Sequence, residues 1–406
     1  MNMNRTDFPI LGEQVYGRPL IYLDNAATAQ KPQAVLDALI EGYTHWNANI
    51  HRGVHYLSQV ATKHHEDARQ HVADFLHARS AKEIVFTKGT TDSVNMLAFS
   101  FGEAMVHEGD EIIVSQLEHH SNIVPWQMLC ERKKAVLRVI PLNNDLSLNI
   151  EAFKGLLNDH TRIVSVAQVS NVLGIINPVE EIIRLAHAQH IPVCIDGAQS
   201  APHLPIDVQA MDCDFFVCSA HKMYGPTGLG VLYGKEQWLN ILPPAEGGGE
   251  MIEHVRFEHT TYNELPYKFE AGTPDFIGSF GFSAALTYIE QIGMKTITQH
   301  EADLSLYAEQ QLAHIAGVRV YAAGLPKAGV VSFNVYNGNT LVHPFDVGTL
   351  LDRQGVAVRT GHHCAEPLID YLNIPGTVRA SFGLYNDHAD IDAFITALKK
   401  AIKMLC

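Results

Sequence analysis

The chain has 406 residues, too many for one ordinary hydrophobic core, so we expect two domains. Its composition, 47% hydrophobic and 18% charged, excludes disordered, collagen-like and coiled-coil proteins. Asp and Glu outnumber Lys and Arg by 44 to 29, and the net charge of -15 argues against nucleic acid and anionic membranes as partners.

The N-terminus and the cysteines indicate the compartment. The first ten residues hold no long apolar run after their one arginine, so we expect no signal peptide. No apolar stretch is long enough to predict a membrane span. The six cysteines include no CxxC pair, which argues against a disulfide framework or a metal or redox motif. We therefore expect a cytoplasmic protein.

Between about Leu23 and Gly234, short apolar runs alternate with helical patterns, which is typical of a mostly parallel sheet with crossover helices. Asn177 before Pro178, with Glu180 following, predicts a capped helix start. The expected strands are 83–87, 111–115, 136–141, 162–169, 191–195, 215–219 and 229–233.

After Gly281 the pattern becomes a long helical region and then a smaller mixture of strands and helices. Segments 329–336, 346–354, 356–360 and 377–384 precede a final helix whose apolar face runs from Ile391 to Leu405. We expect an α/β protein with a large domain, residues 16–285, around the mostly parallel sheet. A smaller α+β C-terminal domain would span residues 286–406, with residues 1–15 packing on it.

Two expected strand ends carry reactive side chains. Asp196 ends one strand, and Lys222 follows the next in Ser-Ala-His-Lys. A carboxylate and an amine at neighbouring strand ends suit pyridoxal phosphate, whose ring nitrogen needs an anionic partner and whose aldehyde needs an amine. From spacing alone, an Asp in a turn and a solvated Lys remain an equal alternative. Gly89-Thr90-Thr91 opens a helix and predicts an anion site, although it is also an ordinary helix cap.

Eight motifs occur in the order found in the class-V group of fold-type-I pyridoxal-phosphate enzymes. They are DNAA at 24–27, GTT at 89–91, EHH at 118–120, SN at 170–171, DGAQ at 196–199, SAHKMYGP at 219–226, EAGTP at 270–274 and RTGHHCA at 359–365. Within this group the sequence resembles the SufS-type (group II) cysteine desulfurases from about Asp7 to its end. Ala220 and Asp275 depart from the pattern, where Gly and Asn are frequent.

The resemblance implies a fold-type-I transferase that is a homodimer and binds pyridoxal 5'-phosphate. Lys222 would hold the cofactor aldehyde and move protons, and Asp196 would keep the ring nitrogen protonated. His119 would stack on the ring. The other cofactor contacts would come from Thr90, Thr91, Asn171, Gln199, Ser219, His221 and, from the second subunit, Thr273.

The resemblance also implies a substrate site for L-cysteine. Arg379 would grip the substrate carboxylate with its bidentate guanidinium. Further residues near the substrate or the entrance would be Arg359, Asn171, Ala26, His51 and His55.

Cys364 decides the expected reaction, because it lies in a short polar loop beside an arginine and two histidines, where a thiolate is favoured. The resemblance implies that this thiolate takes sulfur from L-cysteine as a persulfide, leaving L-alanine, for Fe–S cluster assembly and other sulfur transfer. The short loop predicts slow transfer to small thiols and stimulation by a SufE-like or SufU-like acceptor protein. Cys194, Cys213 and Cys218 should be inert core thiols, and Cys130 and Cys406 stay undecided.

The same residues bear on other possible functions. Selenocysteine lyase activity on L-selenocysteine would use the same scaffold, whereas an aminotransferase or kynureninase would not need Cys364. A non-catalytic sulfur-assembly scaffold would need neither Lys222 nor Cys364. His51 and His55 are four apart, but a Gly and an Arg lie between them and no Glu does, so we expect no catalytic metal. We expect His64, His65, His71 and His77 at helix surfaces.

Overall fold

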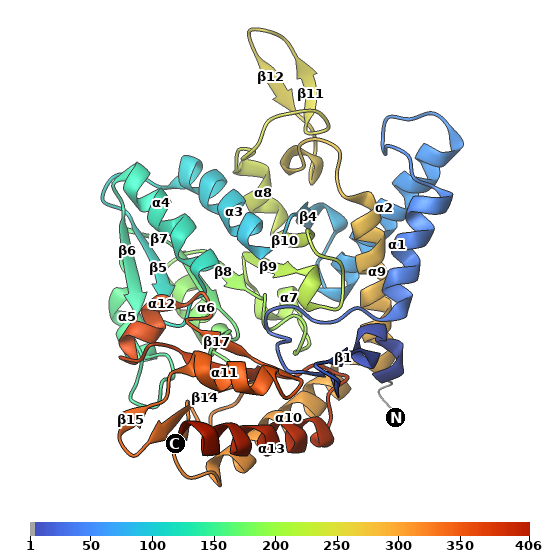
Figure 1. Cartoon of the computed structure of the whole chain (residues 1–406). Helices are drawn as coiled ribbons and strands as arrows, with labels where there is room; N and C mark the ends of the chain where they lie inside the picture. The colour runs from blue at the N-terminus through green and yellow to red at the C-terminus, as the bar shows by residue number, and fades with distance from the viewer. Residues whose placement is uncertain (1–4) are drawn as a thin grey trace.

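The computed structural model describes residues 5–406, and its centre is a seven-stranded sheet (Figure 1). The strand order is β4-β10-β9-β8-β7-β5-β6, and β10 alone runs antiparallel to its neighbours. All seven expected strands form within about two residues of their expected bounds. They are β4 (Ile84–Thr87), β5 (Glu111–Ser115), β6 (Val136–Ile140), β7 (Thr161–Ala167), β8 (Val193–Asp196), β9 (Phe215–Ser219) and β10 (Gly230–Gly234).

Both faces of this sheet are covered by helices, as the apolar strands predict. Successive residues of β5 point into different cores: Ile112 and Val114 into one, Ile113 into the other. The first core includes residues of α3 (Thr90–Met105) and α4 (Val124–Lys133). The second includes residues of α6 (Val179–His187) and α9 (Phe276–Ile292).

The start of α6 differs from the prediction. Pro178 occupies the N-cap position and no side chain caps the helix. Asn177 is not the cap, because it is buried and its Nδ2 donates to the carbonyl oxygen of Ala167, 2.8 Å away. The tertiary contact to the end of β7 therefore competes successfully with the local capping bond.

The C-terminal part forms an antiparallel sheet in the order β13-β14-β18-β17, with β15 (Thr340–Leu341) beside β14. The strands are β13 (Val318–Val320), β14 (Val330–Asn337), β17 (Arg359–Gly361) and β18 (Thr377–Ser381). The helices α10 (Met294–Ala313), α11 (Pro344–Asp352) and α13 (His388–Leu405) share a separate apolar core with it. This is the expected smaller α+β unit.

The exact domain bounds stay a prediction. The expected boundary at 285/286 falls inside α9, and Gly293 separates this helix from α10. Near the N-terminus, Arg5 pairs with Asp390 of α13 at 2.8 Å, while residues 1–4 lie outside the described residues. The segment β3 (Ile21–Tyr22) pairs in parallel with β16 (Val356–Ala357).

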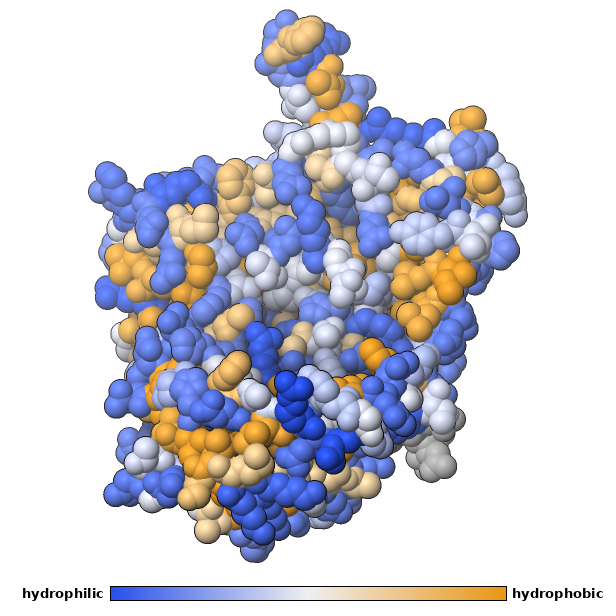
Figure 2. All heavy atoms as spheres, in the orientation of Figure 1, coloured by the Kyte–Doolittle hydropathy of each residue, from blue (hydrophilic) through white to orange (hydrophobic). Residues whose placement is uncertain are grey.

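A hairpin of β11 (Ile252–Val255) and β12 (Thr260–Tyr262) projects from the body of the chain (Figure 1). Figure 2 shows hydrophobic side chains on this projection. Phe257 and Val255 are exposed there. Along residues 5–406, no helix is long and apolar enough to cross a membrane.

Candidate active site

A cavity of about 170 Å³ opens where the parallel strands end, the edge at which α/β sheets place their ligands. Strands β8 and β9 deliver Asp196 and Ser219, while β17, β18 and the loop after β17 close the cavity from the C-terminal side. The structure brings together most of the expected site residues: Ala26, Thr90, Thr91, His119, Asn171, Asp196, Gln199, Ser219, His221, Lys222, Arg359, Cys364 and Arg379.

The first turn of α3 forms one wall of the cavity and is an anion cradle. The N–H of Thr90 donates to Ser219 Oγ at 2.8 Å, and the two hydroxyl oxygens lie 2.7 Å apart. Gly89, with φ of +147°, begins the helix, and a Cβ on Gly230 would lie 2.4 Å from the Gly89 Cα. Only glycine fits at 230, because β10 approaches the turn so closely. The helix N-terminus and the hydroxyls suit a phosphate.

Asp196 and Lys222 lie in the same cavity. Oδ1 of Asp196 accepts from the N–H of Ala198 at 2.9 Å. Burial raises the pKa of Asp196, which the Ala198 bond and Lys222 oppose. Burial also lowers the pKa of Lys222 to about 8, despite the nearby Asp196 carboxylate. A substantial fraction of this amine is therefore neutral at physiological pH and able to attack an aldehyde.

Four side chains of the cavity carry buried polar atoms that have no hydrogen-bond partner within the described chain. They are Asn171 Oδ1, Gln199 Oε1, His363 Nδ1 and Arg379 Nε. Their remaining groups are fixed: Gln199 Nε2 donates to Ala26 O at 2.7 Å, and Arg379 Nη1 donates to Asn171 O at 2.9 Å. Unpaired buried polar atoms are costly, so they indicate a ligand. Together with the anion cradle, the amine and the Asp196 carboxylate, they fit pyridoxal phosphate.

His119 is held as a neutral ring. Its Nδ1 accepts from the N–H of Ser121 at 3.0 Å and lies 2.8 Å from the Ser121 hydroxyl. Burial, and then the charge of Lys222, lower the pKa of His119 to about 3. A neutral imidazole can lie against an aromatic ring. Ser121 was not among the expected site residues, although a hydroxyl two residues after a histidine can form such a local hydrogen bond.

Cys364 is the half-buried thiol of the cavity. It follows β17 and precedes α12 (Glu366–Tyr371), and Nη2 of Arg359 lies 3.8 Å from its Sγ. His363 and Cys364 both have positive φ, at 54° and 56°, a strained pair for residues other than glycine. The N–H of His120 donates to the Cys364 carbonyl at 2.7 Å, which ties the loop to the large domain.

The other cysteines differ from Cys364 in their surroundings. Cys194, Cys213 and Cys218 are fully buried in or beside strands, and burial raises each thiol pKa, that of Cys218 to about 12. The structure also settles Cys130, which is buried in α4 with its pKa raised by burial to about 11. Cys406, the last residue of the chain, is exposed. None of these five lines the cavity.

Three expected site residues do not line this cavity in the single chain, so their roles stay predictions. Thr273 is exposed and lines a different hollow, beside Lys88 and Asp92. His55 caps α2 (Tyr56–Phe75) by accepting from the N–H of Ser58.

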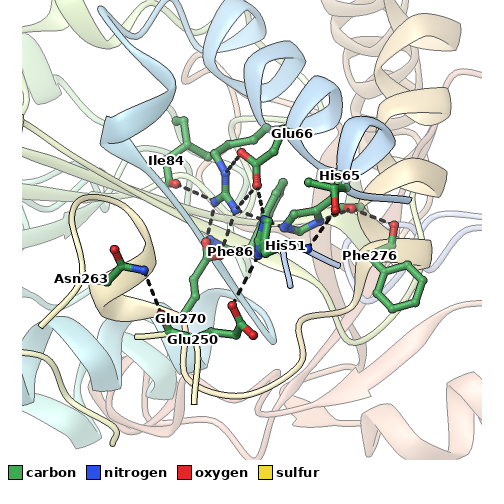
Figure 3. A network of polar contacts seen from close by, with 12 residues as sticks. His51, His65, Glu66, Ile84, Phe86, Glu250, Asn263, Glu270 and Phe276 are labelled. Carbon is green, nitrogen blue, oxygen red and sulfur yellow. Dashed lines mark hydrogen bonds and ion pairs between the residues drawn. The ribbon is translucent and has the colours of Figure 1, made fainter. Parts of the chain in front are cut away.

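His51, the third of these residues, belongs to a polar network (Figure 3). Its Nε2 lies 2.9 Å from Glu66, and its Nδ1 lies 3.7 Å from Glu250. The expectation that His65 lies at a helix surface is wrong: it is 1% exposed and its Nδ1 contacts the Ser279 hydroxyl at 2.8 Å. The face of α2 that carries His65 packs on α9, and this contact buries the histidine.

The same network anchors the segment that leads to Thr273. Buried Arg69 makes a bidentate pair with Glu270, at 2.5 and 2.9 Å (Figure 3). Glu270 also accepts from the N–H of Phe86 on β4 at 2.6 Å. These hydrogen bonds hold Glu270 against the large sheet, and so they fix the start of the segment that runs to Thr273. Across residues 5–406, no group of three or more His, Cys, Asp and Glu side chains is arranged to hold a metal ion.

The chain was compared with known proteins. The class-V aminotransferase family matches residues 21–394. A cysteine desulfurase of Enterobacter sp. (strain 638) is 50% identical over 402 residues, 99% of this chain and 98% of that protein. Two solved cysteine desulfurases, CsdA from Escherichia coli and an apo structure from Thermococcus onnurineus NA1, superpose with TM-scores of 0.90 and 0.92. Each is 38% identical, and each match covers 99% of this chain and 98% of the other.

Proposed function

The chain belongs to the class-V aminotransferase family and, within it, to the cysteine desulfurases, and from that premise we propose that it transfers the sulfur of L-cysteine onto Cys364. One observation carries the assignment of the nucleophile. Cys364 is the only cysteine that lines the cavity among the described residues, and this cavity also holds Lys222, Asp196 and the anion cradle. The amine of Lys222, the carboxylate of Asp196 and the thiol of Cys364 therefore line one cavity, which a small substrate could enter.

The family uses pyridoxal phosphate, which when bound acts as an electron sink that lets the Cα–H bond of an attached amino acid break. We assign its phosphate to the first turn of α3, with Thr90, Thr91 and Ser219. Asp196 would face the ring nitrogen, and Lys222 would hold the aldehyde and later carry the Cα proton. His119 and Gln199 would hold the ring and its hydroxyl.

The substrate carboxylate would bind to Arg379. The Nε of this buried side chain has no partner in the described chain, while its Nη2 donates to Asp24 at 3.0 Å. Arg359, beside Cys364, adds a second positive charge in the same cavity. Two guanidinium groups favour a carboxylate by charge and by geometry.

The sulfur step balances with the thiol of Cys364 as the acceptor. Its thiolate attacks the substrate sulfur, so that an S–S bond forms while the substrate Cβ–S bond breaks. The electron pair of that bond returns to the carbon skeleton, which takes up protons and leaves as L-alanine. The protein keeps one extra sulfur atom as a persulfide. The attacking group in this step is a thiolate, and Nη2 of Arg359 lies 3.8 Å from the Cys364 Sγ.

A dedicated protein would collect this sulfur. The Cys364 loop is short and fastened, because His120 binds the Cys364 carbonyl and Asn171 Nδ2 binds the His363 carbonyl at 2.7 Å. Such a loop cannot carry the persulfide far into solution, so an acceptor must reach the cavity. We propose a SufE-like or SufU-like acceptor and delivery to Fe–S cluster assembly. Equal turnover with and without either acceptor would contradict this.

We further propose a homodimer. Thr273 lies outside the cavity of its own chain, and its segment is anchored by the Arg69–Glu270 pair. Large apolar side chains remain exposed on α1 (Gln33–His45), at Ile40 and Tyr43, and at Phe257 on the projecting hairpin. We propose that a second copy covers these side chains and that Thr273 reaches the phosphate cradle of that copy. The six unpaired thiols support a reducing, cytoplasmic setting.

The experiment for this function uses the purified holoenzyme with L-cysteine, L-selenocysteine and L-kynurenine in separate reactions. We expect L-alanine from L-cysteine together with protein-bound sulfur. Cys364→Ala should retain the cofactor, and lose persulfide formation from L-cysteine. Anthranilate from L-kynurenine, or alanine from L-selenocysteine alone, would reject the proposed substrate.

A further inference from the structure

The turn after β5, residues 118–122, contacts the loop of the nucleophile as well as the cofactor site. His119 lines the active-site cavity, but the next residue, His120, does not. The N–H of His120 donates to the Cys364 carbonyl at 2.7 Å, and Nε2 of its ring accepts from the N–H of Glu366 at 3.0 Å. One residue of the large unit therefore holds the backbone at Cys364 and again two residues further on.

The backbone at Cys364 needs such support because its conformation is strained. His363 and Cys364 lie consecutively in the left-handed region, with φ of 54° and 56°. Residues other than glycine disfavour this region, so the pair persists only where the surrounding bonds hold it. On the N-terminal side, Asn171 Nδ2 donates to the His363 carbonyl, and the His363 ring contacts the Thr377 hydroxyl at 2.9 Å. On the C-terminal side, two of the bonds to the large unit come from His120.

The helix that follows Cys364 depends on the same imidazole. Helix α12 begins at Glu366, and its N-cap residue, Ala365, has no side-chain acceptor. The N–H of Glu366 is bound instead by His120 Nε2, from a residue 246 positions earlier in the chain. The free N–H groups at a helix start need acceptors, so the His120 ring helps to fix where the loop ends and α12 begins.

His120 can hold the loop because its own turn is anchored on the sheet. Glu118 is fully buried, and its carboxylate accepts from Asn122 Nδ2 at 2.7 Å and from the N–H of Ala167 at 3.0 Å. Asn122 Oδ1 in turn accepts from the Ser165 hydroxyl at 2.6 Å. Ala167 and Ser165 both belong to β7, so the turn that carries His120 is fastened to the end of this strand.

We propose that His120 is a positioning residue of the sulfur transfer, and that its imidazole holds the Cys364 thiol where the substrate sulfur arrives. This rests on the proposed function, since it requires Cys364 as the sulfur acceptor. Because His120 does not line the cavity, it acts through the backbone of the Cys364 loop. The reaction of two sulfur atoms depends on their alignment, and a small displacement is costly in rate. Loss of the imidazole therefore slows formation of the S–S bond and leaves the binding of cofactor and substrate unchanged.

The test compares the holoenzyme with its His120→Ala and His120→Gln variants, each mixed with saturating L-cysteine in the absence of an acceptor protein. Quenched flow with peptide mass spectrometry gives the rate at which Cys364 gains a sulfur atom. We expect His120→Ala to lower this rate about tenfold or more. The affinity for L-cysteine, measured from the absorbance change of the bound cofactor, should stay the same. His120→Gln, whose amide oxygen can take the place of Nε2, should recover most of the rate.

Hydrogen exchange gives a second readout that does not depend on turnover. The peptide that contains Glu366 should exchange faster in His120→Ala than in the parent, and His120→Gln should restore its protection. His343→Ala is the matched control, because Nδ1 of His343 accepts from the N–H of Phe345 at the start of α11, outside the active-site cavity. This control should change neither the rate at Cys364 nor the exchange of the Glu366 peptide.

Three results would overturn the role of His120 and leave the proposed function standing. They are a parent rate of sulfur gain in His120→Ala, an equal loss of rate in the Ala and Gln variants, and an affinity for L-cysteine that falls together with the rate. A parent holoenzyme that places no sulfur on Cys364 would overturn the proposed function as well. His120→Phe keeps a ring without an acceptor, so it should behave like His120→Ala and decides the matter should that variant fail to fold.

Discussion

At the residue scale, Lys222 shows how burial prepares a side chain for its task. The carboxylate of Asp196 favours the charged amine, yet desolvation outweighs it and the pKa falls to about 8. The sequence places Lys222 at a strand end and the family motif implies its role, but nothing in the sequence gives the pKa. That value depends on how completely the surrounding segments exclude water.

The lowered pKa of Lys222 predicts the pH dependence of cofactor uptake by the apoprotein. Only the neutral amine attacks an aldehyde, so the uptake rate should rise with pH through about 8 and then level off. An ordinary lysine would give a rate that still rises beyond pH 10. Absorbance in stopped flow measures this rate, with Lys222→Arg as the control that forms no bond at any pH. A rate still climbing steeply above pH 9.5 would contradict the account.

The histidines show where residue-scale prediction fails. The role of His119 follows from its motif, whereas the sequence predicts His65 at a helix surface. In the structure His65 contacts Arg69 and Ser279, and burial lowers its pKa to about 3. Ser279 lies on α9, 214 residues further along the chain, so no local pattern could indicate this contact.

At the element scale, strands were easier to predict than helix ends. Six of the seven strands of the large sheet are almost wholly buried, and such continuous apolar runs are easy to recognise; the exception is β6, at one edge of the sheet, which is mostly exposed and contains Arg138. Helix starts depend instead on single hydrogen bonds. Asn177 was predicted to cap α6 but binds Ala167, while Asp275 caps α9, its Oδ1 accepting from the N–H of Gly278 at 2.7 Å.

The α9 cap gives a physical account of one departure from the family pattern. Asp and Asn cap helices about equally well, so Asp275→Asn should leave the free energy of unfolding nearly unchanged. Asp275→Ala removes the acceptor and should lower it by about 1 kcal/mol. Urea denaturation of both variants measures the difference. Equal stability of Asp275→Ala and the parent would show that this hydrogen bond contributes nothing.

At the scale of the whole molecule, the order of the sequence motifs predicts the fold and most of the residues that line the cavity. It does not show how two copies of the chain would assemble. Motifs far apart in sequence converge because the carboxyl ends of β8 and β9 meet at one edge. Thr273, like His51 and His55, lies outside the cavity of its own chain. Its expected role requires a second copy.

Mixed dimers test this role. One chain carries Lys222→Ala, the other Thr273→Val, and each homodimer should be impaired, the first in activity and the second in cofactor retention. If Thr273 serves the partner's site, the mixed dimer contains one site with both native residues, and cofactor retention and turnover should return to about half of the parent value per dimer. If Thr273 acts within its own chain, no site in the mixed dimer is intact and neither property recovers.

The central claim is that sulfur passes through Cys364, and peptide mass spectrometry after a single turnover with L-cysteine tests it most directly. The holoenzyme is mixed with substoichiometric L-cysteine, alkylated and digested. We predict one additional sulfur atom on the peptide that contains Cys364, in amount equal to the L-alanine released. The peptides of the other five cysteines should carry no additional sulfur. Additional sulfur on another cysteine, or undiminished protein-bound sulfur in Cys364→Ala, would contradict the account.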